Sequence, residues 1–318
     1  MVERQNGKIK EEIPVITILG PTASGKTSKA VGLARVWNAE ILSADSRQVY
    51  RKMNLGTGKD LEEYGEIPFH LIDICEAGEK YNLHRYIKDF REALKNVREK
   101  GKNCIICGGS GMYLENAISD IDLPDVPVNQ ELRKKLEGKS LDELAQLLAQ
   151  QKTLHNTTDI DTAKRAIRAL EIALYYKDNP SLAQKTDRKA VSPLDSLIVG
   201  LEIPREERIR RIDTRLQQRL EAGMLDEVRE IVDSGVAPED LIYYGLEYKY
   251  LTLHLLGEIS YDEMFSQLSI AIHQFAKRQM TWFRGMERRG FKINWVDYNL
   301  SQEDFNSFVL GLYHQTFN

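Results

Sequence analysis

The stretch Ile13-Pro-Val-Ile-Thr-Ile-Leu19, followed directly by Gly20-Pro-Thr-Ala-Ser-Gly25-Lys26-Thr27, decides the fold. Its first seven residues form a continuous apolar, β-branched run, which is typical of a strand buried in a parallel sheet. The next eight match G-x-x-x-x-G-K-[ST], and residues 28–37 have helical character. A glycine-rich loop between a strand and a helix turns backbone N–H groups toward a phosphate, while the lysine neutralises its oxygens. We therefore predict a phosphate-binding loop at residues 20–27, with the Thr27 hydroxyl as a ligand of Mg²⁺.

Two more short apolar runs, at residues 40–43 and 103–107, flank a helical pattern at 83–99. Strands alternating with helices indicate βαβ units, so we predict an α/β fold: a P-loop-type parallel sheet core with helices on both faces. From about residue 119 the chain turns acidic and proline-rich, and helical stretches follow until an apolar run at 197–203. We expect a catalytic core of residues 1–118 and 198–318, including the C-terminal helices, and an all-helical insertion of residues 119–197.

Capping signals mark where several helices begin. Ser140 with Glu143, and Ser260 with Glu263, form capping boxes. Either Asp159 or Asp161 can cap the helix that runs to about residue 176.

Composition narrows the class of protein. The 318 residues include 44 Lys and Arg against 48 Asp and Glu, a net charge of −4, which argues against a generic histone-like binder but not against a local basic surface. The three cysteines Cys75, Cys104 and Cys107 cannot form a disulfide framework, and the last two lack a second ligand pair for zinc. The apolar run near the N-terminus is too short for a signal or a membrane span. We expect a cytoplasmic protein without membrane association.

Two predicted C-terminal helices each carry a basic face. The faces comprise Arg208, Arg211, Arg215 and Arg219 on the first helix, and His273, Lys277, Thr281, Arg284 and Arg288 on the second. The ordinary interpretation of such a face is solvated surface, and a surface for a polyanion is the alternative.

Polar clusters follow two of the other predicted strands. In Ser43-Ala-Asp45-Ser46-Arg47-Gln48, a carboxylate at the end of a strand suits a general base or a water-mediated magnesium ligand, whereas a helix cap is the competing interpretation. Gly108-Gly109-Ser110-Gly111 closes another strand. Its serine hydroxyl can donate to a phosphate oxygen, and a plain tight turn is the alternative.

These segments together resemble the tRNA dimethylallyltransferases, the tRNA isopentenyltransferase family, over about residues 13–285. The segments that carry the resemblance are GPTASGKT (20–27), SADSRQVYRKMNLGTGK (43–59), GGSGMYL (108–114), RAIRALE (165–171), RIDTR (211–215), GEISYDEM (257–264) and FAKRQMTWFRG (275–285). The resemblance implies an enzyme that transfers the dimethylallyl group of dimethylallyl diphosphate to the exocyclic amine of the adenosine just 3′ of the tRNA anticodon, releasing diphosphate. It also implies a channel that the two substrates enter from opposite sides.

The resemblance assigns roles to residues of this chain. Asp45 is the expected general base, and Ser110 and Arg215 are the expected catalytic donors to the leaving diphosphate. The expected diphosphate-binding residues are Gly20, Pro21, Thr22, Ala23, Ser24, Gly25, Lys26, Thr27 and Arg211, with Mg²⁺ on Thr27. The expected tRNA-binding residues are Asp45, Ser46, Arg47, Gln48, Lys164, Arg165, Arg168, His273, Lys277, Arg278 and Arg284. The partners implied are tRNA and dimethylallyl diphosphate, and we expect a monomer.

The chain departs from the family pattern in four places. Ser110 replaces the usual threonine and keeps the hydroxyl, while the turn at residues 156–161 lacks the usual asparagine-aspartate step. The expected glycine-tyrosine pair reads Glu247-Tyr248, which places an acid near the expected RNA contacts. No Cys₂His₂ pattern follows residue 285, so we expect a bacterial-type enzyme without the zinc finger of eukaryotic relatives.

Three alternatives remain open at this point. The first is an adenylate isopentenyltransferase that uses free AMP, ADP or ATP. The second is an ATP-dependent P-loop small-molecule kinase, because the motif at 20–27 usually holds a nucleotide. The third is an RNA-binding regulator with a degenerate phosphate loop, which would bind RNA without turnover.

Overall fold

The structure, a computed structural model, describes residues 13–119, 125–151, 160–183 and 194–317. The chain forms two compact units, Met1–Ile118 with Leu194–Asn318, and Ser119–Pro193. The chain thus returns to the first unit four residues earlier than the predicted boundary at 198. The reason is register: Ser196 and Leu197 already pair with Val15 and Ile16 in the sheet. Residues 120–124, within the acidic and proline-rich stretch, lie outside the described residues.

The first unit is built on a six-stranded sheet in the order β3-β2-β4-β1-β5-β6, and every pairing is parallel. The strands are β1 (Val15–Leu19), β2 (Ala39–Ala44), β3 (Phe69–His70), β4 (Asn103–Gly108), β5 (Ser196–Glu202) and β6 (Ile293–Asp297). The apolar runs had indicated the four central strands, which are buried on both faces. The edge strands β3 and β6 gave no such signal, because β3 has two residues and β6 is only partly buried.

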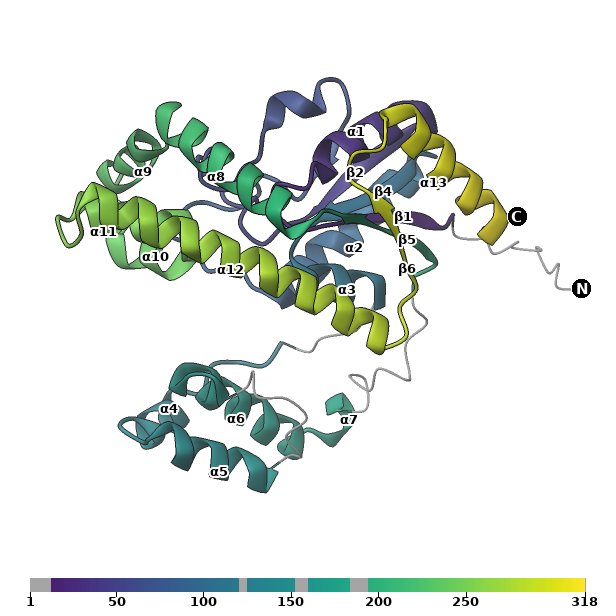
Figure 1. Cartoon of the computed structure of the whole chain (residues 1–318). Coiled ribbons are helices and arrows are strands. Elements are labelled where there is room, and N and C mark those ends of the chain that lie inside the picture. Colours follow the sequence, from purple (N-terminus) through teal and green to yellow (C-terminus); the bar gives the residue numbers. More distant parts are fainter. Residues whose placement is uncertain (1–12, 120–124, 152–159, 184–193, 318) are drawn as a thin grey trace, which may run out of the picture. The chain divides into compact units, whose positions relative to one another are not determined.

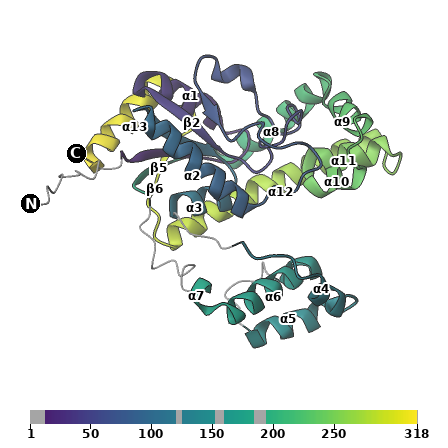
Figure 2. The ribbon, with the colours of Figure 1, turned by 180° about the vertical axis from the view of Figure 1, so that it is seen from behind.

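Helices cover both faces of this sheet, which confirms the predicted fold class. Figures 1 and 2 show α1 (Lys26–Trp37) and α13 (Gln302–Phe317) on one face, and α2 (Leu83–Glu99) and α3 (Gly111–Ser119) on the other. The α1 side packs a buried core against α13, in which Leu33 and Phe305 have no exposed surface. Packing of this kind fixes the position of α1, and therefore of the loop that precedes it.

A second core lies beside the sheet within the same unit. It is formed by α8 (Arg205–Glu221), α9 (Met224–Asp233), α10 (Pro238–Tyr244), α11 (Leu246–Leu255) and α12 (Tyr261–Arg288), together with side chains that follow β2. Figure 1 shows α8 and α12 running from this group toward the sheet. The capping box of Ser260 and Glu263 opens α12 as predicted. Because Val49 and Met53 belong to this core, the segment after β2 is fixed against these helices.

The second unit is entirely helical in its described part. Its helices are α4 (Gln130–Leu136), α5 (Leu141–Gln151), α6 (Ala163–Asp178) and α7 (Pro180–Ala183). The capping box of Ser140 and Glu143 opens α5 as predicted, with hydrogen bonds in both directions. The prediction for α6 was wrong at Asp161: Thr162 caps the helix, and Asp161 instead pairs with Arg165. Asp159 lies outside the described residues.

The core of the second unit is small and contains one buried carboxylate. Glu171 of α6 accepts hydrogen bonds from the backbone N–H of Asn129 and from the side chains of Arg133 and Arg168. Burial by itself would raise the pKa of Glu171, but these hydrogen bonds outweigh it and lower the pKa. The ionised carboxylate therefore ties α4 to α6.

None of the helices in the described ranges is both long enough and apolar enough to cross a membrane.

Candidate active site

The loop at residues 20–27 joins β1 to α1, as the sequence predicts. Gly25 precedes the helix with φ 83°, and Ala23 also has a positive φ of 61°, which is uncommon for a residue with a side chain. Such strain concentrates at functional sites. The Ser24 hydroxyl is buried in this loop, and no group in the described part of the chain satisfies it. The loop has the form of a phosphate cradle with an unsatisfied donor.

Lys26 begins α1 and is enclosed by charged groups from other segments. Its ammonium donates to the carbonyl oxygen of Pro21 at 3.4 Å. Burial lowers the pKa of Lys26, and the positive charges of Arg215 and Arg219 lower it further, while Asp45 opposes them. The carboxylate and the two guanidinium groups therefore lie within electrostatic range of the phosphate loop.

The Asp45 segment and the Ser110 segment meet because β2 and β4 are neighbours in the sheet. Ala44 pairs with Gly108 at the ends of these strands. Two residues further on, the Ser110 Oγ accepts a hydrogen bond from the backbone N–H of Ser46 at 3.0 Å and lies 3.3 Å from the Ser46 Oγ. The structure thus brings together two motifs that lie 64 positions apart.

Asp45 combines features of both interpretations drawn from the sequence. Its Oδ1 accepts a hydrogen bond from the backbone N–H of Arg47 at 2.9 Å, which is the geometry of a cap. The side chain is nevertheless half-buried at the carboxyl end of β2, within electrostatic range of Lys26. The arrangement leaves the second carboxylate oxygen as the candidate proton acceptor.

The phosphate loop is joined to the Gly108–Gly111 loop by a residue that sequence reasoning missed. Gln279 of α12 is buried, and its Oε1 accepts from the backbone N–H of Thr22 at 2.8 Å, while its Nε2 donates to the carbonyl oxygen of Gly109 at 2.9 Å. A Cβ at Gly109 would lie 2.4 Å from the Gln279 Nε2, so only glycine allows this approach. The signal in the sequence was the FAKRQMTWFRG segment, which carries the family resemblance but in which only basic residues received a predicted role.

Arginines from α8 close the other side of the phosphate loop. Arg211 donates to the carbonyl oxygen of Ala23 at 3.2 Å, and the ring of Tyr298 lies 5.2 Å from the centre of its guanidinium. Arg215 and Arg219 both contact Asp60; the sequence had placed Arg219 on the basic face but not in the diphosphate site. Burial lowers the pKa of Arg215 to about 10, and the nearby Arg219 lowers it too.

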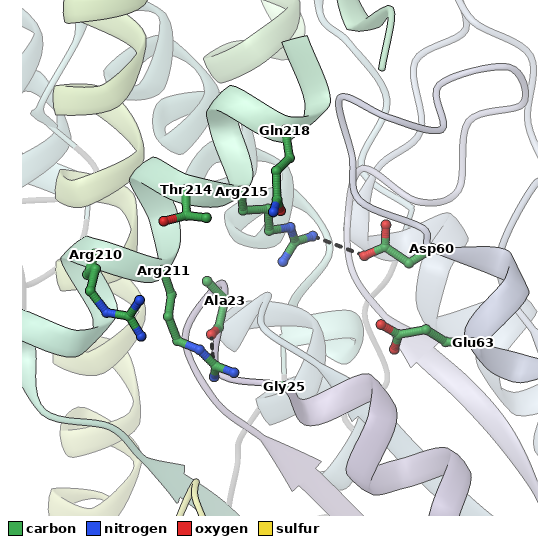
Figure 3. Close-up of a pocket in the computed structure, with 9 residues that line it drawn as sticks. All are labelled: Ala23, Gly25, Asp60, Glu63, Arg210, Arg211, Thr214, Arg215 and Gln218. Atoms are coloured by element: carbon green, nitrogen blue, oxygen red, sulfur yellow. Dashed lines mark hydrogen bonds and ion pairs between the residues drawn. The ribbon is translucent and has the colours of Figure 1, made fainter. Parts of the chain in front are cut away.

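These groups surround an open cavity of about 330 Å³ (Figure 3). Figure 3 shows the guanidinium groups of Arg211 and Arg215 turned toward the phosphate loop and toward the segment that carries Asp60 and Glu63. The lining residues are Ala23, Gly25, Asp60, Glu63, Arg210, Arg211, Thr214, Arg215 and Gln218. The sequence had predicted Ala23, Gly25, Arg211 and Arg215 as site residues, but it gave no indication of the two acids. The cavity suits a compact anion with several oxygens.

Three of the residues predicted to bind tRNA have their polar atoms engaged within the protein. The amide of the buried Gln48 bonds to Ser43 and to the carbonyl oxygen of Gly58. His273 of α12 contacts Asp213 of α8 at 2.8 Å. Arg168 is bonded to Glu171 and to the backbone of the second unit. Their contribution to tRNA binding stays a prediction, and their contacts in the structure join segments of the protein.

The other predicted tRNA-binding residues are half-buried or exposed. Arg47 is half-buried and stacks over the ring of Tyr244 at 5.5 Å, and Arg165 is exposed and paired with Asp161. Lys164, Lys277, Arg278 and Arg284 are exposed as well.

A basic cluster joins the start of α8 to the end of α12. Burial lowers the pKa of Arg208, and the positive charges of Arg205 and Arg284 lower it further. Like charges held this close destabilise one another until an anion binds between them. This cluster supports the alternative that the basic faces form a surface for a polyanion.

The cysteines behave as the sequence indicated. Cys75, Cys104 and Cys107 are free and buried, and burial raises the pKa of the last two to about 12. Within the ranges that the structure describes, no three His, Cys, Asp or Glu residues come together as a metal centre.

The fold and the site define a P-loop-type α/β protein whose phosphate cradle is completed by arginines from a C-terminal helix. A sequence model of the family described as IPP transferase matches residues 48–286, and one described as Isopentenyl transferase matches residues 13–67. The chain belongs to the IPP transferase family, which confirms the resemblance found in the sequence.

Individual relatives agree with this assignment. The chain is 57% identical over 294 residues to tRNA dimethylallyltransferase 1 of Parabacteroides distasonis, covering 91% of this chain and 94% of the relative. It is 56% identical over 299 residues to tRNA dimethylallyltransferase 2 of Bacteroides fragilis, covering 93% and 96%. The structure is similar to the crystal structure of the full-length tRNA isopentenylpyrophosphate transferase from Bacillus halodurans, with a TM-score of 0.69, 28% identity, and coverage of 96% of this chain and 98% of that chain.

Proposed function

We propose that this chain transfers the dimethylallyl group of dimethylallyl diphosphate to the exocyclic amine of the adenosine 3′-adjacent to the tRNA anticodon, releasing diphosphate. One observation supports the proposal most: the phosphate loop and the α8 arginines line a single cavity, and Asp45, whose loop is bonded to Ser110, lies within electrostatic range of Lys26 in the same phosphate loop. A site for a leaving diphosphate thus lies beside a candidate base. The names of the relatives at 56–57% identity support the same reaction.

The bonds, electron pairs and proton of the proposed prenyl transfer can all be accounted for with groups near the phosphate loop. The bond from the prenyl carbon to the diphosphate oxygen breaks, and its electron pair leaves with diphosphate. The adenine nitrogen supplies the pair for the new carbon–nitrogen bond, and its proton passes to Asp45. Lys26, Arg211, Arg215 and the Ser110 hydroxyl stabilise the charge that develops on diphosphate. One such donor contributes about 10²–10³ in rate.

The adenosine must leave its stack for its amine to reach the prenyl carbon, which costs a few kcal/mol. Contacts with tRNA phosphates offset this cost, and we assign them to the cluster of Arg208 and Arg284, with Lys277 and Arg278 beside it on α12. In the helical unit we propose Lys164 and Arg165 as further phosphate contacts. Affinity that depends on such contacts is expected to fall with salt.

The residues of the cradle fit a magnesium ion. Thr27 is half-buried at the start of α1, and the Ser24 hydroxyl of the same loop is buried and unsatisfied by the described residues. Oxygen donors of this kind, completed by diphosphate oxygens and water, are the ligands that Mg²⁺ takes. When bound, the ion would neutralise charge on the leaving diphosphate. Thr27 is the residue that we propose holds it.

We further propose that the enzyme acts as a monomer in the cytoplasm. Every group assigned to the cavity comes from one chain, so a second copy is not required to complete it. Its three cysteines are free thiols, which suits a reducing compartment.

The proposal is tested by comparing acceptors. Purified protein with dimethylallyl diphosphate should prenylate an unmodified tRNA anticodon stem-loop faster than AMP, ADP or ATP. Faster turnover of the free nucleotides would instead identify an adenylate isopentenyltransferase. Calorimetry separates the kinase alternative, which requires tight ATP binding and no binding of dimethylallyl diphosphate. Nucleoside mass spectrometry of tRNA from cells lacking the gene should show loss of isopentenyladenosine derivatives.

A further inference from the structure

The segment at residues 52–60 is firmly anchored beside the cavity. The carboxylate of Glu227 on α9 accepts hydrogen bonds from three successive backbone N–H groups, residues 54–56, at 2.7–3.1 Å. Further along, the fully buried Lys59 pairs with Asp73. A segment fixed at both points has little freedom to move, so the residues that follow it are held in place.

This segment reaches the α8 arginines at a glycine. Gly58 has φ 63°, and a Cβ there would lie 2.0 Å from the Arg215 Nη2 and 2.4 Å from the Arg219 Nη2. Any larger residue would displace both guanidinium groups. The close approach brings the next residues of the segment alongside the two arginines.

Asp60 bridges the two guanidinium groups. Its Oδ1 and Oδ2 accept from the Arg219 Nη2 at 3.0 Å and 2.9 Å, and its Oδ2 accepts from the Arg215 Nη2 at 3.4 Å (Figure 3 shows the contact with Arg215). Asp60 also precedes the short helix η1 (Leu61–Tyr64), where an aspartate usually caps the helix. Its side chain makes no cap hydrogen bond. The carboxylate is committed to the arginines instead.

We propose that Asp60 is a positioning residue that fixes the guanidinium group of Arg215, which lines the phosphate-loop cavity, together with that of the adjacent Arg219. The inference rests on the proposed function for the identity of the anion, the diphosphate of the prenyl donor. Two guanidinium groups side by side repel each other, and a carboxylate that bonds to both holds the Arg215 group in its place in the cavity lining. Donors that are already oriented need no reorganisation when charge develops on the leaving group.

A carboxylate near an anion site has a competing role that predicts the opposite result. If Asp60 only neutralised positive charge, its removal would strengthen the attraction for diphosphate. If it positions the arginines, its removal weakens diphosphate binding and slows the reaction, although the net charge of the cavity becomes more positive. The two roles are therefore distinguished by whether the affinity for diphosphate falls or rises when Asp60 is replaced.

The charge state of Arg215 can be followed through the pH dependence of diphosphate binding. A purely structural role of Asp60 would leave that pH dependence unchanged. The charged groups facing this guanidinium are Lys26 of α1, Asp60 and Glu63 at η1, Arg219 of α8 and Glu247 of α11. Burial lowers the pKa of Arg215 to about 10, and the charge of Asp60 opposes that shift. Without Asp60 the pKa of Arg215 falls further. As pH is raised, the loss of affinity for diphosphate should therefore begin at a lower pH than in the wild type.

The test uses the full-length protein with Asp60→Asn, Asp60→Glu and, as a matched control, Glu62→Gln, which removes an exposed carboxylate from the same segment. Inorganic pyrophosphate binding is measured by calorimetry with Mg²⁺ as pH is raised toward 10. Prenyl transfer to an anticodon stem-loop is measured as kcat and KM for dimethylallyl diphosphate. Thermal unfolding confirms that each variant is folded.

We expect Asp60→Asn to weaken pyrophosphate binding and lower kcat, each by about tenfold, and to shift the alkaline decline to lower pH. Asp60→Glu should recover part of both losses, and Glu62→Gln should match the wild type. Unchanged or tighter pyrophosphate binding in Asp60→Asn, or an unmoved alkaline decline, would overturn the proposal. If the wild type prenylates no acceptor while the pyrophosphate results hold, the proposed function fails and the assignment of Asp60 stands.

Discussion

Gln279 accepts a hydrogen bond from the backbone N–H of Thr22 at 2.8 Å, although the two residues lie 257 positions apart. The same amide donates to the carbonyl oxygen of Gly109. One side chain of α12 therefore fixes the distance between the phosphate loop after β1 and the glycine-rich loop after β4. The helix that carries the exposed basic residues also sets the geometry of the anion cradle.

Replacing Gln279 should damage catalysis beyond its cost in stability. Gln279→Ala leaves a buried N–H and a buried carbonyl unpaired, so we expect a loss of about 1–3 kcal/mol in the free energy of unfolding. We also expect kcat/KM for dimethylallyl diphosphate to fall at least about tenfold under conditions where the variant is fully folded, because the donors on both loops move. Urea unfolding and steady-state kinetics measure the two effects. The matched control is Gln274→Ala, at an exposed position of the same helix, and equal kinetics in both variants would contradict the prediction.

Asp45→Asn separates the two interpretations of Asp45. Asparagine retains the Oδ1 that accepts from the Arg47 N–H, so the cap survives, but it cannot take a proton. If Asp45 is the general base, prenyl transfer should fall by about 10²–10⁴ while tRNA binding is retained. Single-turnover transfer and a filter-binding assay provide the measurements. Normal transfer by the asparagine variant would leave Asp45 with the cap alone.

The arginine cluster between α8 and α12 predicts a salt effect. Each of Arg208→Gln and Arg284→Gln should weaken tRNA binding and reduce the slope of log affinity against log salt by about one, as expected for a lost phosphate contact. Titrations of tRNA at several salt concentrations give the slope. Lys95→Gln changes the same charge at an exposed position of α2 and should leave the slope unaltered. A slope equal to that of the wild type in both arginine variants would exclude these residues from the interface.

The buried Glu171 makes the helical unit sensitive to acid. Because the pKa of Glu171 in the folded protein lies below its ordinary value of 4.5, its stabilisation is present above that pH. It is lost as pH falls through the lowered folded pKa. Glu171→Gln should destabilise α4 and α6 by about 1.5–3 kcal/mol at neutral pH and flatten the acid dependence.

Hydrogen exchange of amides in α4 and α6, corrected for the intrinsic rate at each pH, tests the effect of Glu171. The exposed Glu131 offers a control in Glu131→Gln on α4. Protection in Glu171→Gln that falls with acid as steeply as in the wild type would assign the acid sensitivity to another group.

Local sequence patterns predicted much of the fold. The apolar run before Gly20 and the glycine-lysine motif after it are contiguous, so they specify β1, the phosphate loop and the start of α1 without help from the rest of the chain. The capping boxes at Ser140 and Ser260 were equally local. The predicted cap of α6 at Asp161 was wrong. Three oxygen-bearing side chains within four positions could each have capped this helix, and only the backbone geometry selects Thr162.

The sequence by itself thus determined the family, the parallel sheet core and the position of the glycine-rich loop after β1, because each depends on neighbouring residues or on the order of motifs. Only the tertiary structure revealed that Asp60 contacts Arg219, 159 positions away, and that Gln279 joins two loops. Such contacts depend on the strand order β2-β4-β1-β5, which brings the carboxyl ends of separate strands together, and on the second core, which orients α8 and α12 beside them. No pattern along the chain encodes a distance between segments that far apart.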